Sequence, residues 1–246
     1  MFCEEKRILF IHIPKTAGST VELLLEPFSN NKVELVKRAK EKYDWDDDVE
    51  VHVKQRGVMH AKHWSLKEHL RGWMINDLNS IQSFTIVRNP YERMIKLFLF
   101  KIQNGEFKPK GNEPGYAEHL VKPRGKHITE AVINNWSHSM FAEFLTKKRE
   151  LNKMGVRTFL SAWDHCVAEN KTLGVQHIVK YEKLSHELPE VFEKMGLPRP
   201  IDIPVTNSTQ PLSEEQLRSF YNKNNQLRVE QLWGNDFEPF GYEKWK

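Results

Sequence analysis

A short buried strand that runs straight into a small polar loop constrains this chain most. Residues 7–13 (RILFIHI) are nearly continuous in β-branched, aromatic and other apolar side chains, without the alternation of a half-exposed strand. Such a run is typical of a strand covered on both faces, as in a parallel sheet. Pro14 ends the run, the polar stretch 15–20 (KTAGST) follows, and apolar residues over 21–25 then recur at helical spacing. The chain is therefore expected to open with a strand, a tight loop and a helix.

Two later apolar runs repeat the order of strand and helix. Residues 83–87 (SFTIV) predict a second buried strand, followed by an apolar helix that starts near Met94. Residues 176–181 (QHIVKY) predict a third strand, with a helix over 188–195 after it. Strands that alternate with helices indicate the α/β class, with a mostly parallel central sheet flanked by helices.

The remaining segments predict three more helices and one long loop. We expect a polar helix over 32–50, an aromatic-rich helix over 135–148 and a C-terminal helix over 213–233 that Ser213 caps. The aromatic side chains of 135–148 are expected in the core rather than in a ligand cage. The stretch 104–127 is rich in glycine, proline and lysine, which predicts a long surface loop or lid.

Length and composition favour one globular domain over residues 1–246. No apolar run approaches the roughly 20 residues that cross a bilayer, and the N-terminus lacks the apolar region of a signal peptide. With 37 Lys and Arg against 33 Asp and Glu, the net charge is +4. This mild surplus suits an anionic ligand and is far from the concentrated basic surface of a nucleic-acid binder.

The two cysteines and the acidic residues predict neither a disulfide framework nor a metal site. Cys3 and Cys166 have no CxxC or histidine neighbour at the spacing of zinc ligands. No HExxH motif is present in the sequence. A reducing, cytoplasmic location is the simplest context for such a chain.

The loop over 15–20 has the properties of an anion site. A loop between strand and helix directs backbone N–H groups, and the positive end of the helix dipole, at one point. Gly18 lets backbone approach closely, Lys15 adds a charge, and the nearby hydroxyls of Thr16, Ser19 and Thr20 add donors. The nucleoside-triphosphate P-loop, GxxxxGK[ST], places its lysine after the second glycine. Here Lys15 precedes the only glycine, so an ATPase or kinase is disfavoured.

Two motifs resemble the cofactor-binding motifs of sulfotransferases that use 3′-phosphoadenosine 5′-phosphosulfate (PAPS). Residues 11–20 (IHIPKTAGST) resemble the 5′-phosphosulfate loop of the branch containing Golgi carbohydrate sulfotransferases and their soluble bacterial relatives. Residues 84–93 (FTIVRNPYER) resemble the 3′-phosphate motif of that family, a strand followed by RxPxxRxxSxY. Weaker similarities follow at 179–184 (VKYEKL) and 236–242 (DFEPFGY).

The resemblance implies a P-loop-like α/β domain and a set of site residues. PAPS would be the donor and adenosine 3′,5′-bisphosphate the product, without a metal. The acceptor would be a hydroxyl of a carbohydrate or glycosylated small molecule, with other small-molecule and lipid-linked acceptors left open. Lys96 stands where the family has a serine that contacts the 3′-phosphate. The cofactor-binding residues implied are Pro14, Lys15, Thr16, Ala17, Gly18, Ser19, Thr20, Arg88 and Lys96.

The catalytic residues implied are Lys15 for the developing charge and a histidine for the acceptor proton. Residues 62–66 (KHWSL) fit the family pattern around the presumed base, so His63 is the first choice and His60 the second. His12, within the buried strand, is expected to be structural. A P-loop nucleotide or metabolite kinase and a non-catalytic nucleotide-binding module are the alternatives. The absent GK[ST] argues against the first, and the retention of Lys15, Arg88 and a candidate base against the second.

Overall fold

The computed structural model describes residues 1–29, 63–103, 107, 138–147, 159–203 and 212–246. Within it the chain divides into two compact units. Unit 1 comprises Met1–Arg88 and Leu160–Thr206, and unit 2 comprises Asn89–Phe159 and Asn207–Lys246. The expectation of a single domain over the whole chain stays a prediction. The helix expected over 32–50 lies outside the described residues.

Unit 1 contains a four-stranded sheet in the order β1-β2-β3-β4. The edge strand β1 (Phe2–Cys3) pairs antiparallel with β2 (Ile8–Ile11). The strands β3 (Gln82–Val87) and β4 (His177–Lys180) follow, and β2–β3 and β3–β4 are parallel pairs. The three predicted strands and the mostly parallel sheet are therefore confirmed. Sequence analysis missed β1, because two residues are too few to show a period.

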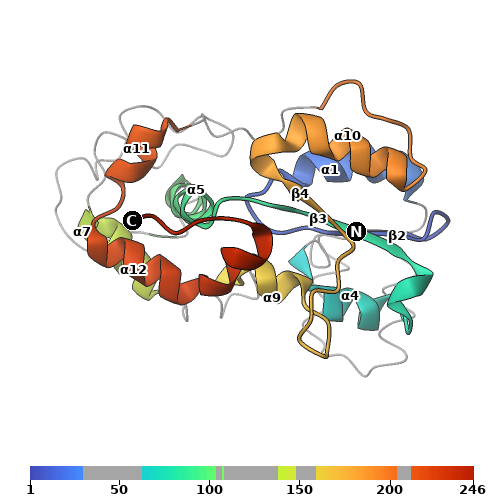
Figure 1. Cartoon of the computed structure of the whole chain (residues 1–246), viewed down its shortest axis with the longest axis horizontal. Helices are drawn as coiled ribbons and strands as arrows, with labels where there is room; N and C mark the ends of the chain where they lie inside the picture. The colour runs from blue at the N-terminus through green and yellow to red at the C-terminus, as the bar shows by residue number, and fades with distance from the viewer. Residues whose placement is uncertain (30–62, 104–106, 108–137, 148–158, 204–211) are drawn as a thin grey trace. The chain divides into compact units, whose positions relative to one another are not determined.

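Helices cover both faces of this sheet (Figure 1). The helices α1 (Gly18–Leu25) and α10 (Leu184–Lys194) lie on one face, and α4 (Leu66–Gly72) lies on the other, where it packs with α9 (Ala162–Cys166). Under α1 and α10, Phe84 packs on Phe10 with ring centroids 4.9 Å apart and on Phe192 at 6.0 Å. Such aromatic pairs add roughly 0.5–1.5 kcal/mol each beyond their burial. The second contact holds α10 onto the sheet, and α1 buries Val21 and Leu25 in the same apolar cluster.

The helix after β3 begins earlier than its apolar pattern suggested. The helix α5 (Pro90–Gln103) starts at the proline, and the Asn89 side chain accepts a hydrogen bond from Tyr91 N at 3.0 Å. Asparagine before the first turn and proline at the first position are the residues preferred at a helix start. Because these residues directly follow Arg88, the turn from strand to helix is very short. Likewise, α10 begins four residues before the predicted 188.

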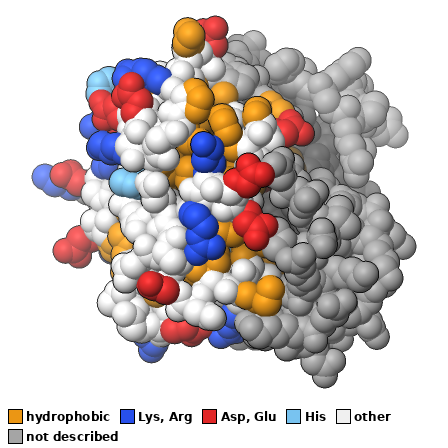
Figure 2. All heavy atoms as spheres, turned by 90° about the vertical axis from the view of Figure 1, so that its right-hand side faces the viewer, with side chains coloured by type: hydrophobic (Ala, Val, Ile, Leu, Met, Phe, Trp, Pro, Cys, Tyr) orange, Lys and Arg blue, Asp and Glu red, His pale blue; other side chains and the backbone are white. Residues whose placement is uncertain are grey.

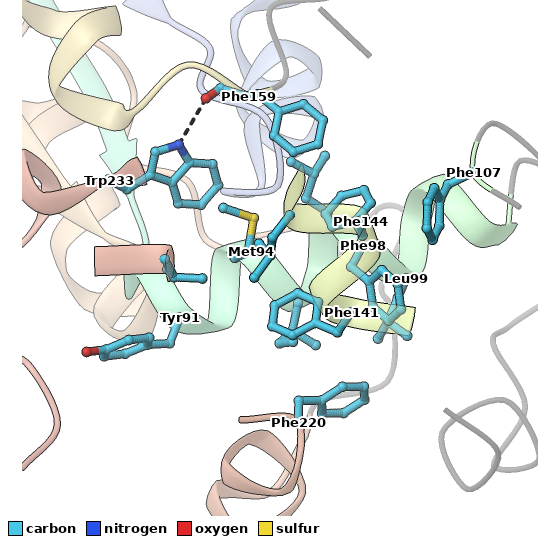
Figure 3. Packing of buried hydrophobic residues seen from close by; sticks show 14 of the residues in the cluster. Tyr91, Met94, Phe98, Leu99, Phe107, Phe141, Phe144, Phe159, Phe220 and Trp233 are labelled. Carbon is cyan, nitrogen blue, oxygen red and sulfur yellow. Dashed lines mark hydrogen bonds between the residues drawn. The ribbon is translucent and has the colours of Figure 1, made fainter. Parts of the chain in front are cut away.

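Unit 2 is helical around an aromatic core (Figure 3). Its helices are α5, α7 (His138–Thr146), α11 (Glu214–Ser219) and α12 (Lys223–Leu232). The predicted core role of the aromatic residues in α7 is confirmed, since Phe141 and Phe144 are fully buried beside Phe98. Phe107, the one described residue of the predicted lid, is buried in the same cluster. The described residues of the two units also form short 3-10 helices: η1 (Glu26–Phe28), η4 (Leu78–Ser80), η7 (Tyr181–Lys183), η8 (Gly234–Asp236) and η9 (Glu238–Phe240).

The single helix predicted over 213–233 is wrong, because the segment forms two helices. Ser213 caps α11 in a capping box with Gln216, as expected. A second cap follows at Asn222, whose side chain accepts a hydrogen bond from Asn225 N at 2.8 Å and starts α12. The break between the helices allows Phe220 to be fully buried in the core. A side-chain cap inside a helical pattern thus ended one helix and began another.

A buried ion pair links the two most distant motifs of unit 2. Arg93, in the motif after β3, lies 3.4 Å from the carboxylate of Asp236 in the C-terminal motif, and both side chains are about fully buried. The Arg93 guanidinium also lies 4.2 Å from the ring centroid of Trp233. Arg93 is therefore held by the core of unit 2.

We expect Asp236→Asn to lower the free energy of unfolding by about 3–5 kcal/mol, because it removes the carboxylate that neutralises a buried guanidinium. Urea denaturation followed by circular dichroism measures this change. Glu238→Gln is the matched control, since Glu238 is exposed two residues away, and its effect should stay within about 0.5 kcal/mol. Equal effects of the two substitutions would show that the ion pair does not stabilise unit 2.

Candidate functional site

The parallel pairing brings three separate segments to one edge of the sheet. In the register, Ile11 faces Thr85 and Val87 faces Lys180. Because the carboxyl ends of parallel strands meet at the same edge, the loop after β2, Arg88 after β3 and Tyr181 after β4 converge there. A buried hydrogen bond from Thr85 Oγ1 to Ile11 O at 2.8 Å fixes this edge further.

The loop between β2 and α1 has an unusual backbone. Lys15 and Ala17 have φ values of 69° and 68°, in the left-handed region that glycine adopts more readily. Each non-glycine residue in this conformation raises the free energy of the folded state by roughly 1–2 kcal/mol. Thr16 between them is fully buried and donates its hydroxyl proton to Ile13 O at 2.8 Å. The Thr16 hydroxyl was predicted to donate to a ligand. In this structure it donates to Ile13 O instead, and this hydrogen bond holds the loop in its strained form.

The first turn of α1 begins without a side-chain cap. Ala17 is the N-cap residue and has no polar side chain to accept the N–H groups of that turn. Among the helices that the structure describes, α5, α9, α11 and α12 begin with a capping side chain, Asn89, Ser161, Ser213 and Asn222 respectively, whereas α10 also lacks one. The positive end of the α1 dipole is thus suited to an anion. Of the predicted hydroxyl donors, Thr20 is buried and Ser19 is partly exposed.

Gly18 makes room for a neighbouring histidine. A Cβ atom at Gly18 would lie 2.1 Å from His12 Cδ2 and 2.2 Å from His12 Nε2, so no other residue fits without movement of that ring. The sequence suggested that this glycine allows a close approach of backbone. The close approach in the structure is that of the His12 ring, which is buried directly after β2.

Lys15 and Arg88 place two cations beside the loop. Arg88 is buried and its Nη1 donates a hydrogen bond to Lys15 O at 3.2 Å. Burial, followed by the charge of Arg88, lowers the pKa of the Lys15 ammonium from 10.5 to about 8. Lys15 therefore carries its charge below about pH 8 and loses it as the pH rises further. A bound anion would offset this shift, because a nearby negative charge favours the charged ammonium.

Tyr181 orients Arg88, and sequence analysis gave Tyr181 no role. The Arg88 guanidinium carbon lies 3.8 Å from the centroid of the Tyr181 ring. A planar guanidinium that stacks on a ring keeps its edge available for directed hydrogen bonds. The pairing of Val87 with Lys180 explains the contact, because it places the two following residues side by side. The strand register was needed to find this residue.

The preferred candidate base, His63, contacts the start of the loop. His63 Nδ1 donates a hydrogen bond to His12 O at 3.3 Å, and the two rings meet edge to face with centroids 4.6 Å apart. In a neutral imidazole that donates through Nδ1, Nε2 holds the lone pair that can accept a proton. His60 lies outside the described residues. Lys96 is a buried residue of α5 in unit 2.

Charges of both signs are mixed over the described residues of one face of the molecule. On the face drawn in Figure 2, Lys and Arg side chains lie among Asp, Glu and hydrophobic side chains. Over the described part of the chain, no group of three His, Cys, Asp or Glu side chains is placed to hold a metal ion. Within the same residues, no helix has the length and hydropathy to span a bilayer.

The fold defines a P-loop-like α/β protein, and the turn after its first parallel strand is suited to an anion. A family model described as "Sulfotransferase family" matches residues 1–243, and the chain belongs to that family. It is therefore a transferase of sulfuryl groups. Comparison with curated proteins and with solved structures gave no match.

We expect Gly18→Ala to destabilise the protein by about 1–3 kcal/mol, because the new methyl group overlaps the His12 ring. Ala17→Gly, one residue away, should change stability by less than about 1 kcal/mol, since relief of left-handed strain offsets the greater entropy of the unfolded chain. Thermal and urea unfolding of both variants measure these effects.

The overlap can be tested by removing the ring. In a His12→Ala background, Gly18→Ala should cost less than about 1 kcal/mol if the ring causes the overlap. An undiminished cost in that background would contradict the assignment.

Proposed function

We propose that this sulfotransferase uses PAPS as donor and transfers its sulfuryl group to a hydroxyl, with a carbohydrate or glycosylated small molecule as acceptor. The observation that carries the proposal is the pair Lys15 and Arg88 beside the uncapped start of α1. Two cations and a helix N-terminus at one edge of the sheet suit a ligand with phosphate groups at both ends.

The residues present fit the donor. A desolvated lysine with a lowered pKa, next to a second cation, is an arrangement that an anion stabilises. We assign the 5′ end to the loop and the 3′-phosphate to Arg88, with Lys96 as a further predicted contact. The loop residues proposed to bind are Pro14, Lys15, Thr16, Ala17, Gly18, Ser19 and Thr20; for Thr16 we assign the backbone N–H, because its hydroxyl bonds Ile13 O.

The proposed mechanism depends on charge stabilisation and one proton transfer. The donor supplies an activated sulfuryl group with a phosphate oxyanion as leaving group. Lys15 and the N–H groups of the first turn of α1 stabilise the negative charge that grows on that side. His63 accepts the proton of the acceptor hydroxyl at Nε2, while its Nδ1–H stays bonded to His12 O.

The proposed acceptor class rests on the resemblance of the two motifs, whereas the proposed location rests on the two cysteines, which predict no disulfide framework. A cytoplasmic location and a small-molecule or lipid-linked acceptor remain part of the proposal. Membership of the family favours this reading over a kinase or a non-catalytic nucleotide-binding module.

The function can be tested with radiolabelled PAPS and a panel of hydroxyl acceptors, with products identified by mass spectrometry. We expect turnover by the wild type, a loss on the order of 10²–10³ in Lys15→Ala and a loss on the order of 10²–10⁴ in His63→Ala. His60→Ala should have a smaller effect. Lys6→Ala serves as the control, because Lys6 is an exposed residue of unit 1.

Two results would contradict the proposal. Turnover by Lys15→Ala at the wild-type rate would remove the role of Lys15. Thermal stabilisation by ATP–Mg²⁺ but not by adenosine 3′,5′-bisphosphate, without sulfuryl transfer to any acceptor, would favour a kinase.

Binding of two nucleotides separates the roles of Arg88 and Tyr181. We expect Arg88→Ala to lower the affinity for adenosine 3′,5′-bisphosphate by roughly 10- to 100-fold, through the loss of charge-assisted hydrogen bonds. The affinity for adenosine 5′-phosphate should fall less. It should still fall measurably, because Arg88 also donates a hydrogen bond to Lys15 O in the loop. Tyr181→Leu should lower the affinity for the bisphosphate by roughly 2- to 30-fold. Tyr181→Phe keeps the ring and should bind the bisphosphate as the wild type does. Calorimetry with both nucleotides measures these ratios. Equal losses for both nucleotides would place Arg88 on the 5′ side alone.

A further inference from the structure

A line of three side chains in unit 1 connects α1 with the segment that leads into α4. It runs from Glu22, on the second turn of α1, through the His12 ring to His63. Sequence analysis predicted His12 as structural and did not consider Glu22. Both residues lie beside the loop that is proposed to bind the donor.

The contacts along this line are directional. A carboxylate can only accept, so His12 Nδ1 donates to Glu22 Oε1, at 2.8 Å. The His12 side chain is 4% exposed and that of Glu22 is 23% exposed. The opposite edge of the His12 ring lies against Gly18, whose missing Cβ provides the space. The ring therefore spans one turn of α1, from Gly18 to Glu22, and is held at both edges.

We propose that Glu22 is a positioning residue for the transfer reaction, which holds His12 in place and favours the uptake of the acceptor proton by His63. This inference rests on the proposed function, in which His63 is the base. With His12 neutral, the Glu22 carboxylate carries one negative charge, and the His12 ring that it bonds lies between it and the His63 ring. That charge stabilises the His63 imidazolium formed when Nε2 takes the proton.

The proton itself stays on His63. The rings of His12 and His63 meet edge to face, and the hydrogen bond between the two residues runs from His63 Nδ1 to the backbone carbonyl of His12. Neither Glu22 nor His12 gains a proton in the step. Glu22 acts by orientation and charge through His12, which it bonds directly and which in turn contacts His63.

The other charges recorded near this line explain why a carboxylate is useful. Lys15 and Arg88 carry positive charge at the loop and oppose the protonation of a nearby imidazole. Glu68 on α4 accepts hydrogen bonds from Ser65 N and Ser65 Oγ, each at 2.8 Å, and caps that helix. Glu22 is thus the carboxylate that bonds the His12 ring.

His69 on α4 also interacts with His12 but does not compete for protons near neutral pH. Burial lowers the pKa of His69 well below 6.5, with smaller contributions from the terminal ammonium, His165 and His12. Its Nδ1 accepts a hydrogen bond from Trp73 Nε1 at 3.1 Å. His69 therefore stays neutral near neutral pH.

The test compares variants of Glu22 by histidine NMR titration and by the pH dependence of kcat. Glu22→Gln keeps an oxygen that can accept from His12 and removes only the charge, whereas Glu22→Ala removes both. We expect each substitution to lower the pKa of His63 by about 0.5–1 unit. Resonances are assigned with His63→Asn and His12→Asn. Glu26→Gln, an exposed change one turn further along, is the matched control and should shift nothing.

The kinetic readout separates charge from orientation. We expect kcat to fall by roughly 3- to 10-fold in Glu22→Gln and further in Glu22→Ala. Glu22→Asp should restore part of the rate, and the affinity for adenosine 3′,5′-bisphosphate should stay within about threefold throughout. Circular dichroism and urea unfolding verify that each variant is folded.

An unchanged pKa of His63 in both Glu22→Gln and Glu22→Ala would overturn the proposal, as would an unchanged kcat in an active enzyme. The titration requires no turnover, so it remains decisive if the wild type transfers no sulfuryl group. In that case a shifted pKa would support the coupling of Glu22 to His63, while the missing turnover would contradict the proposed function alone.

Discussion

The parallel pairing of β2 with β3 is the constraint on which the candidate site depends. Its register places Ile11 opposite Thr85, so the loop after β2 and Arg88 after β3 emerge at the same edge of the sheet. The hydrogen bond from Arg88 to Lys15 O crosses this edge and joins the two motifs. Pairing with β4 adds Tyr181 by the same geometry. Residues more than 70 positions apart in the sequence thus form one electropositive cluster.

The strained loop is stabilised by the protein around it. Left-handed backbone at Lys15 and Ala17 is unfavourable alone, and bonds from Thr16 to Ile13 and from Arg88 to Lys15 hold it in place. Strain of this kind is found where a binding site must be preorganised. The lowered pKa of Lys15 indicates a second cost, because the buried ammonium lies close to the positive charge of Arg88. Both costs are the kind that a bound phosphate offsets, which is consistent with membership of the sulfotransferase family.

The second half of the family motif after β3 serves stability. Arg93 pairs with Asp236 and stacks on Trp233 inside unit 2, whereas Arg88, five residues earlier, belongs to the site. The two arginines look equivalent in the sequence. Burial against an aspartate from the C-terminal motif separates their roles, because a guanidinium in a core needs a carboxylate close by.

The sequence by itself determined the α/β class, the three parallel strands, the order of strand, loop and helix around residues 15–20 and the family resemblance. These features depend on local order, on runs of apolar residues and on a loop motif read along the chain. The second cap at Asn222, the edge strand β1, the stack of Arg88 on Tyr181 and the line from Glu22 through His12 to His63 appeared only in the tertiary structure. Each of them depends on strand register, on the packing of one ring against a glycine or on local competition between caps. Sequence spacing alone does not specify these interactions, because their partners meet only after the chain has folded.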